Sequence, residues 1–320
     1  MCELSATSLV VKLMTSPGWR RGKWQSRKFR LMFLLRCGLY PLATFRYLRA
    51  LCDLEDIHHL LVVNPTLPAK PHRPYLHRGG SVRTRAQAVL DHYHAVQAQP
   101  EGVRQILTVS RETLLCRLAG RQGGRLDITC SPCGFDREGE LMLILRYNDT
   151  VITRLSFSLI RCRGRLTLFI GGLQGPARGE GTDIIRRATR ECHGLFPRRV
   201  LCEALSVLAQ LCRVDGVVAV SETRHVLRQL RYFYRKKGRF VACYSECWRS
   251  VGGRVREDGD YDLPVVLPRR EAADIPARKR AEYRRRNDLL GEVRDSLTAR
   301  ARHDITATDP HHNERRTDID

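Results

Sequence analysis

The sequence predicts an α+β protein in which an antiparallel meander is followed by a helix crossover to a parallel strand, with helical additions at both ends. Two changes of pattern predict this class. Apolar residues recur at helical spacing up to about residue 118, and short runs rich in Leu, Ile, Thr and Phe follow them. Helical segments then separate the last of these runs from the apolar run Gly216–Ser221, and such a crossover joins parallel strands. The 320 residues, 42% of them hydrophobic, suffice for one large core.

Residues 1–64 are predicted to form a basic helical segment. The stretch Trp19–Arg30 carries six basic residues and no acid, with aromatic residues between them. This pattern suits phosphate contact with base stacking, or an anionic bilayer, and it equally suits an amphipathic helix whose aromatic rings dock on the main domain. Leu31–Leu61 has a helical pattern, and four prolines between residues 65 and 74 then break regular structure. Residues 65–80 are therefore expected to be a Pro-rich linker or a wrapped loop.

Residues 81–270 are predicted to be the core of the protein. Two helices are expected first, over Arg83–Gln97 and Val103–Leu118. Turn signals at Asn148-Asp149 and Arg163-Gly164 favour hairpins, so the strands on either side of them should pair antiparallel. The predicted strands are Arg125–Cys130, Glu140–Tyr147, Val151–Cys162 and Arg165–Leu173.

Two helices are expected to form the crossover. The first spans Thr182–His193, and the second begins at Pro197, whose ring fits the first turn of a helix. Gly216–Ser221 should then be a buried parallel strand, and a helix near Glu222–Lys236 and a strand at Arg239–Ser245 complete the core. The second crossover helix has one apolar face, made of Val200, Leu201, Ala204, Leu205, Leu208 and Leu211.

The C-terminal part is predicted to be a basic helix followed by a tail. Ala277–Arg286 carries six basic residues and one acid, and leucines at helical spacing follow it. The helix, expected within residues 271–304, could bind RNA, DNA or anionic lipid, or it could be a solvated helix that packs through its leucine face. Residues 305–320 offer little to bury and are expected to be disordered.

The order of these elements resembles the fold of GNAT acyltransferases. The likeness concerns the order alone, so it is an analogy at the level of the fold. It implies a GNAT-like core in which the strand ending at Leu173 separates from the strand ending at Ser221. The gap would then receive the pantetheine arm of acyl-coenzyme A or of an acyl carrier protein.

Several motifs resemble those of the VirK/YbjX family of bacterial proteins. The most specific are FIGGLQGP at Phe169–Pro176 and CHGLFPRRVL at Cys192–Leu201. The chain departs from the family pattern at Arg198-Arg199, where a Lys after a polar partner is expected, and at Cys247, where a bulkier residue is usual. The resemblance implies a link to virulence, envelope integrity and tolerance of cationic antimicrobial peptides, and it assigns no molecular activity. Further matches are EGEL at Glu138–Leu141, LSFSL at Leu155–Leu159, VSETRHV at Val220–Val226, YSECW at Tyr244–Trp248 and IPARKRAEYRRR at Ile275–Arg286.

The GNAT-like interpretation predicts residues that hold the carrier. Free backbone N–H groups at the helix start at Pro197 would face its pyrophosphate, and Gly194 would allow close approach. Arg198 and Arg199 could add bonds to phosphate. Alternatively, Gly194 and Pro197 merely end one helix and begin the next. The predicted carrier site also includes Leu173, Gln174, Gly175 and Ser221, where the Gln174 amide bonds either the carrier or its own backbone.

Three residues are predicted to do the chemistry, each with a structural alternative. His193 could be a general base, or it could contact the last carbonyl groups of its helix. His225 follows a strand end, where a ligand would meet the sheet, but it also suits the first turn of a helix. Tyr244 could donate a proton late in the reaction, or it could be a core aromatic residue.

The cysteine pattern predicts no metal. Cys130 and Cys133 have the spacing of half a metal site, but no second pair of ligands follows them. The twelve cysteines are scattered, and no secretory signal or uninterrupted apolar run of membrane-spanning length is evident. We therefore expect a cytoplasmic protein with reduced thiols that can touch the inner membrane.

The charge predicts polyanionic partners. Lys plus Arg number 56 against 34 Asp plus Glu, a net charge of +22, although Arg richness also follows from a GC-rich genome. The sequence thus leaves two functions open. One is a GNAT-like acyltransferase, and the other is a non-catalytic module that binds nucleic acid or anionic membrane. The predicted contacts for the second are Arg20, Arg21, Lys23, Arg284, Arg285 and Arg286.

Overall fold

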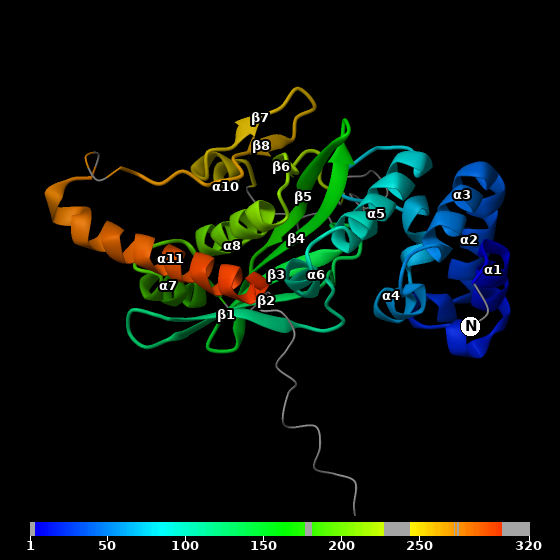
Figure 1. Cartoon of the computed structure of the whole chain (residues 1–320), viewed down its shortest axis with the longest axis horizontal. Helices are drawn as coiled ribbons and strands as arrows, with labels where there is room; N and C mark the ends of the chain where they lie inside the picture. Colours follow the sequence, from blue (N-terminus) through cyan, green and yellow to red (C-terminus); the bar gives the residue numbers. More distant parts are fainter. Residues whose placement is uncertain (1–3, 177–180, 227–243, 272, 274, 303–320) are drawn as a thin grey trace, which may run out of the picture.

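A mixed sheet is the centre of the computed structural model, which describes residues 4–176, 181–226, 244–271, 273 and 275–302 (Figure 1). Within these residues eight strands lie in the order β1-β2-β3-β4-β5-β6-β8-β7. All neighbours are antiparallel except β5 and β6, which are parallel, so the α+β class is confirmed. The strands are β1 (Thr113–Ala119), β2 (Arg125–Pro132), β3 (Leu141–Tyr147), β4 (Thr150–Cys162), β5 (Arg165–Gln174), β6 (Gly216–Ala219), β7 (Arg254–Val255) and β8 (Tyr261–Leu263).

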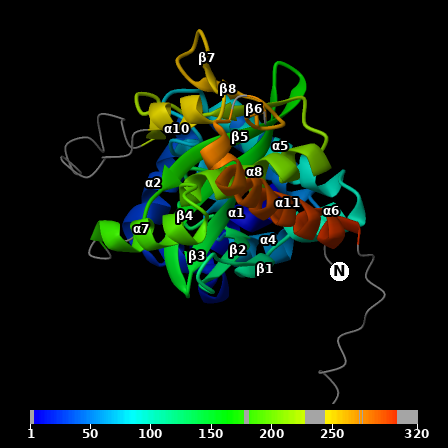
Figure 2. The ribbon, with the colours of Figure 1, turned by 90° about the vertical axis from the view of Figure 1, so that its left-hand side faces the viewer.

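Helices pack on the sheet from both sides. α5 lies against β4, whereas α8 lies against β3 and β4, and α11 packs on α8 and β1 (Figures 1 and 2). Helices α1 to α4 lie at the far end of the molecule from α11 (Figure 1). The α-helices are α1 (Ala6–Thr15), α2 (Arg27–Leu39), α3 (Pro41–Cys52), α4 (Ile57–Val63), α5 (Val82–Gln97), α6 (Glu101–Leu107), α7 (Gly181–Glu191), α8 (Pro197–Leu211), α10 (Tyr244–Ser250) and α11 (Arg280–Arg302).

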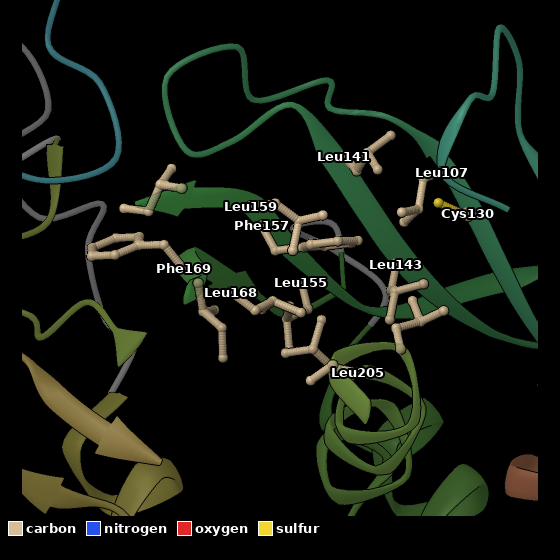
Figure 3. Packing of buried hydrophobic residues seen from close by; sticks show 14 of the residues in the cluster. Leu107, Cys130, Leu141, Leu143, Leu155, Phe157, Leu159, Leu168, Phe169 and Leu205 are labelled. Carbon is tan, nitrogen blue, oxygen red and sulfur yellow. The ribbon is translucent and has the colours of Figure 1, made fainter. Parts of the chain in front are cut away.

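Apolar side chains from α8 and the sheet form the core. Figure 3 shows Leu205 of α8 beside Leu143 of β3 and Leu155 of β4, all of them buried. Five of the six residues expected on the apolar face of this helix are buried, and Leu211 is partly buried. The predicted amphipathic pattern of α8 is therefore confirmed.

The aromatic rings of the basic N-terminal stretch are docked. Trp24 is buried, its ring centroid lies 5.0 Å from those of Phe29 and Phe33, and its indole N–H donates to the carbonyl of Pro65. A buried indole has no face available for a nucleic-acid base. Downstream, Leu67–His72 forms a 3-10 helix, η3, and all six of its residues are buried.

Two predicted elements are wrong in part. The helix expected over Val103–Leu118 ends at Leu107, and Thr113–Ala119 is strand β1, because its backbone pairs with β2 and a short apolar run fits either period. Tyr244 and Ser245, expected in a strand, begin α10, since the Glu222 carboxylate accepts from the Ser245 N–H (2.6 Å) at the helix start.

Other expectations are refined or lie outside the described residues. The helical stretch Leu31–Leu61 is divided into α2, α3 and α4. Glu222–His225 are in turn and bend conformations at the start of the helix expected near Glu222–Lys236. Residues 227–243, including most of the strand expected at Arg239–Ser245, and the tail 305–320 lie outside the described residues.

A buried histidine joins α5 to the sheet. His92 accepts a hydrogen bond from the Leu159 N–H through Nδ1 (3.2 Å), and the residue is 2% exposed. Burial, followed by the charge of Lys70, lowers the pKa of His92 to about 3. Because folding holds this imidazole neutral, its contribution to stability is present above the pKa of an unfolded histidine and is lost as the pH falls.

We expect the free energy of unfolding to fall by about 2 kcal/mol between about pH 7.5 and about pH 5 through His92, since only the unfolded imidazole takes up a proton there. Urea unfolding at both pH values measures this. His92→Asn keeps an acceptor near the position of Nδ1 and should remove that part of the pH dependence. His94→Asn changes an exposed histidine of the same helix and should keep it. An undiminished pH dependence in His92→Asn would contradict the assignment.

Candidate functional site

The parallel strands β5 and β6 separate at their C-terminal ends. They pair from Thr167 to Ile170, and the Val220 N–H donates to the Ile170 carbonyl (2.9 Å). β5 then continues to Gln174, whereas β6 ends at Ala219. The register of β4 with β5 also skips Gly171, which leaves this residue as a bulge. The bulge and the extra length of β5 create a place where side chains can enter between the strands.

Glu138 lies against this part of β5. A Cβ atom on Gly171 would lie 1.9 Å from the Glu138 carbonyl oxygen, and one on Gly172 would lie 2.0 Å from Glu138 Oε2. Both distances are far below van der Waals contact, so only glycine fits at either position. The paired glycines of the GGLQG motif therefore make room for the EGEL turn.

The carboxylate of Glu138 is buried and surrounded by polar side chains. Glu138 is 3% exposed, and His225, which is 0% exposed, places Nε2 3.2 Å from Glu138 Oε1. Gln174 Nε2 donates to both carboxylate oxygens (3.1 and 3.3 Å), and Ser156 Oγ donates to Oε2 (3.4 Å). Burial of a carboxylate is costly, and these contacts offset that cost.

Tyr244 of α10 completes the group. Its hydroxyl accepts from the Leu173 N–H (3.2 Å) and lies 3.5 Å from Gln174 Nε2. Its ring meets that of His225 edge to face, with centroids 5.6 Å apart. Burial, followed by the charge of Glu138, raises the pKa of Tyr244 well above its ordinary value, so the phenol stays protonated. We call Glu138, Ser156, Gln174, His225 and Tyr244 the Glu138 cluster.

The structure brings part of the predicted site together. Leu173, Gln174, His225 and Tyr244 meet at the Glu138 cluster. Ser221 precedes His225 in the chain and is buried, and its N–H donates to Asp260 Oδ1 (3.1 Å). Gly175 follows Gln174 directly and is exposed, and no heavy atom of the described residues lies within 4 Å of its Cβ position. The residue next to Gln174 in the chain is therefore at the surface.

His193 and Gly194 lie in a different group, against α11. The His193 carbonyl accepts from Arg286 Nε (2.8 Å), and a Cβ on Gly194 would lie 2.6 Å from Arg286 Nη2. Burial, then Arg285, Arg121 and Arg286, lower the pKa of His193. Among the contacts of the described residues, none joins His193 to the Glu138 cluster.

The predicted phosphate-binding residues at the start of α8 differ in the side chains that they contact. Pro197 is the first residue of α8, and Arg199 pairs with Glu203 one turn later (2.9 Å). Arg198 lies over the Phe196 ring at 5.7 Å. Cys202, and then the charge of Arg198, lower the pKa of the Cys247 thiol of α10, the helix that carries Tyr244. Arg198 is thus the member of this group that lies near the helix of the cluster.

Glu138 and Ser156 were missed as site residues from the sequence. Glu138 reads as an ordinary acid of a polar turn, and Ser156 as one of the alternating polar residues of a strand. One feature of the sequence could have indicated these two residues: each lies in a motif, EGEL or LSFSL, on which the family resemblance rests. Five motifs quoted for that resemblance meet at this cluster, and only the fold shows it.

A second buried polar group lies beside the first. Lys70 is 1% exposed and places Nζ 2.5 Å from Glu140 Oε1, while Tyr75 and Tyr93 donate to the Glu140 carboxylate (2.8 and 2.9 Å). A cavity of about 550 Å³ adjoins it between α4, α5, α6 and β2, and Tyr93, Glu140 and His92 are among its lining residues. Because Lys70 and Glu140 already pair with each other, this buried ion pair connects η3 to the segment that precedes β3.

Neither metal ligation nor a membrane span is evident in the described part of the chain. No group of three or more His, Cys, Asp or Glu side chains there is arranged to hold a metal ion. Burial raises the pKa of both Cys130 and Cys133 to about 12, so these thiols are poor ligands and poor nucleophiles. None of its helices is long and apolar enough to cross a bilayer.

Fold and cluster together define an α+β protein with a buried acid–histidine–tyrosine group where two parallel strands separate. A family model described as "Protein of unknown function (DUF535)" matches residues 22–299. The chain is also 34% identical over 299 residues to the "Uncharacterized protein YbjX" of Escherichia coli (strain K12). The matched stretch covers 92% of this chain and 90% of the relative. The chain belongs to this VirK/YbjX family, and the resemblance inferred from its motifs is confirmed.

More distant relatives add no function. An "Uncharacterized protein" of Haemophilus influenzae is 26% identical over 128 residues, or 39% of this chain and 41% of the relative. A second protein of that organism with the same description is 24% identical over 132 residues, with the same coverage. No solved structure matches the chain at a significant level.

The contact of Gly172 with Glu138 gives a test of the cluster. Gly172→Ala should destabilise the protein by about 1–3 kcal/mol, because the new methyl group meets a carboxylate that is held in place. All three atoms nearest to that methyl group belong to the Glu138 side chain. Glu138→Ala should therefore relieve much of the clash, so that the two substitutions are strongly non-additive in urea unfolding.

Gly175→Ala is the matched control, since its Cβ position is open, and it should leave stability nearly unchanged. Strictly additive effects of Gly172→Ala and Glu138→Ala would show that the glycine is required for some other reason.

Proposed function

We propose that the protein is an acyltransferase that moves an acyl group from coenzyme A or an acyl carrier protein to an amine or hydroxyl acceptor. One observation carries this proposal, namely that the Glu138 cluster lies where β5 separates from β6. The order of α5, α6, the β1–β5 meander, the α7–α8 crossover and β6 supports it, because it is the order that suggested a GNAT-like core from the sequence.

In this proposal the pantetheine arm enters between the ends of β5 and β6, from the open side at Gly175. Gln174 then exchanges its bond to Glu138 for one to a carrier amide. Pyrophosphate would bind at Gly194, Pro197, Arg198 and Arg199, and Arg198 has the best position for it because it is exposed and lies near α10. An acceptor in the cell envelope would connect the activity to the envelope role that the family resemblance implies.

The proposed chemistry uses His225 as the base and Tyr244 as the acid. His225 takes a proton from the acceptor, whose nitrogen or oxygen forms a bond to the thioester carbonyl carbon. The carbon–sulfur bond then breaks, and the leaving thiolate receives a proton from Tyr244, whose high pKa keeps it protonated until that step. Glu138 orients His225, since its Oε1 lies 3.2 Å from His225 Nε2.

Thermal unfolding with candidate carriers tests the binding step. Coenzyme A, acyl-coenzyme A or acyl carrier protein at a hundredfold excess over Kd should stabilise the protein by about 2.7 kcal/mol, which raises Tm by several degrees. His225→Gln should retain this shift but lose about 10²- to 10⁴-fold of any acyl transfer, and the exposed His94→Gln should retain both. The absence of a shift with all three carriers would refute the proposal.

A second candidate function is polyanion binding, which the net charge of +22 favours. Three of the six predicted contacts already have partners: Arg20 donates to the Met14 carbonyl, Lys23 pairs with Asp136, and Arg286 pairs with Glu282. Arg21, Arg284 and Arg285 are exposed, so these three are the residues that remain for a polyanion.

Salt dependence separates this candidate from acyl transfer. If Arg284 and Arg285 contact phosphates, the double substitution to Gln should reduce the slope of log K against log salt for duplex DNA by about 2. The exposed pair Arg186 and Arg187 of α7, changed in the same way, should leave the slope unchanged. Equal effects of the two double substitutions would show that only general charge attracts nucleic acid.

A further inference from the structure

An unusual concentration of apolar side chains faces outward on α2 and α3. Of the fourteen large apolar residues that are exposed in the described chain, seven lie within residues 31–45, so the exposure is local. Their exposed fractions range from 43% to 73%, and the two highest belong to Leu39 and Leu42. We call these seven the α2–α3 face: Leu31, Leu34, Leu35, Leu39, Tyr40, Leu42 and Phe45.

The α2–α3 face is separate from the residues that hold these helices to the protein. Phe33 of α2 and Tyr47, Leu48 and Leu51 of α3 are buried and anchor the two helices. Leu31, Leu35 and Leu39 follow one another at four-residue intervals along the exposed side of α2, which is the spacing of one helix face. The two helices therefore have an apolar surface beyond the one that folding uses, and apolar patches of this kind mark interaction sites.

The charges on α2 and α3 themselves have one sign. Between Leu4 and Cys52 the chain has ten Lys and Arg residues and no Asp or Glu. Arg27 and Lys28 at the start of α2, and Arg46 and Arg49 of α3, are exposed. A second copy of this chain on the same face would bring like charges together, which is unfavourable. An apolar surface with a negatively charged boundary complements both features.

We propose that the α2–α3 face docks on an anionic lipid bilayer. The leucines and Phe45 enter the boundary between headgroups and acyl chains, and Arg27, Lys28, Arg46 and Arg49 contact lipid phosphates. The position of α1 to α3 at one end of the molecule lets a flat surface approach them without meeting the sheet (Figure 1). This binding goes beyond the proposed acyl transfer and does not depend on it.

Flotation of the full chain with vesicles tests the proposal. The protein should float with phosphatidylglycerol vesicles and much less with phosphatidylcholine vesicles. Leu39→Gln/Leu42→Gln should weaken partitioning onto phosphatidylglycerol by about tenfold or more, because two apolar side chains no longer leave water. Arg46→Gln/Arg49→Gln should also weaken it, and added salt should reduce that second effect.

Matched variants at other surface positions distinguish binding through the α2–α3 face from nonspecific binding of the protein to vesicles. Val255→Gln/Val266→Gln changes two side chains that are each 59% exposed, and Arg186→Gln/Arg187→Gln changes an exposed basic pair of α7. Both should float as the unchanged protein does, and so should His225→Gln. Unchanged flotation of Leu39→Gln/Leu42→Gln would overturn the proposal. A second result would also overturn it: the unchanged protein binds neither kind of vesicle and sediments as a dimer, and Leu39→Gln/Leu42→Gln converts this dimer to a monomer.

Discussion

Burial of the Glu138 carboxylate is the constraint on which the arrangement of the site depends. A carboxylate that is 3% exposed is stable only among donors or positive charges, and here the contacts come from Ser156, Gln174 and His225. These residues belong to β4, to β5 and to the segment after β6. Their contacts with one carboxylate therefore fix the positions of three separate parts of the chain. Gly171 and Gly172 have no side chains, so Glu138 can lie directly against β5.

The segment that carries Glu138 alternates its acids between two surroundings. Glu138 faces the separated ends of β5 and β6, whereas Asp136 and Glu140 contact the N-terminal part of the chain. Burial opposes ionisation of Asp136, but Lys70, Arg73 and Lys23 outweigh it and hold its pKa below the ordinary range. The N-terminal helices and the candidate site are thus joined through one short turn, although Figure 1 shows them in different parts of the molecule.

Elements with one clear period could be predicted from the sequence, and contacts between distant segments could not. The apolar face of α8 and the hairpins around Asn148 and Arg163 follow from local pattern, and the structure has them. β1 was missed because a run such as Thr113–Ala119 fits either period until β2 pairs with it. His225 was singled out by its place after a strand end, Gln174 as an amide that could bond the carrier, and Tyr244 as a possible proton donor. Glu138 acquires its importance only from its burial. His193 was singled out as a possible general base, and it lies against Arg286 because α11 returns to that turn.

The distinction between charges that are already paired and charges that are exposed decides which basic residues can serve a partner. Lys23 and Lys70 pair with Asp136 and Glu140, so removing either would leave a carboxylate with fewer partners and would disturb the fold itself. Arg27, Lys28, Arg46 and Arg49 are exposed beside an apolar face, and neither α2 nor α3 contains an acid. The basic composition that the sequence presents as one feature is therefore two. One part neutralises the acids that fix the N-terminal helices in place, and the other part remains on the outer surface of those helices, where a negatively charged partner would meet it.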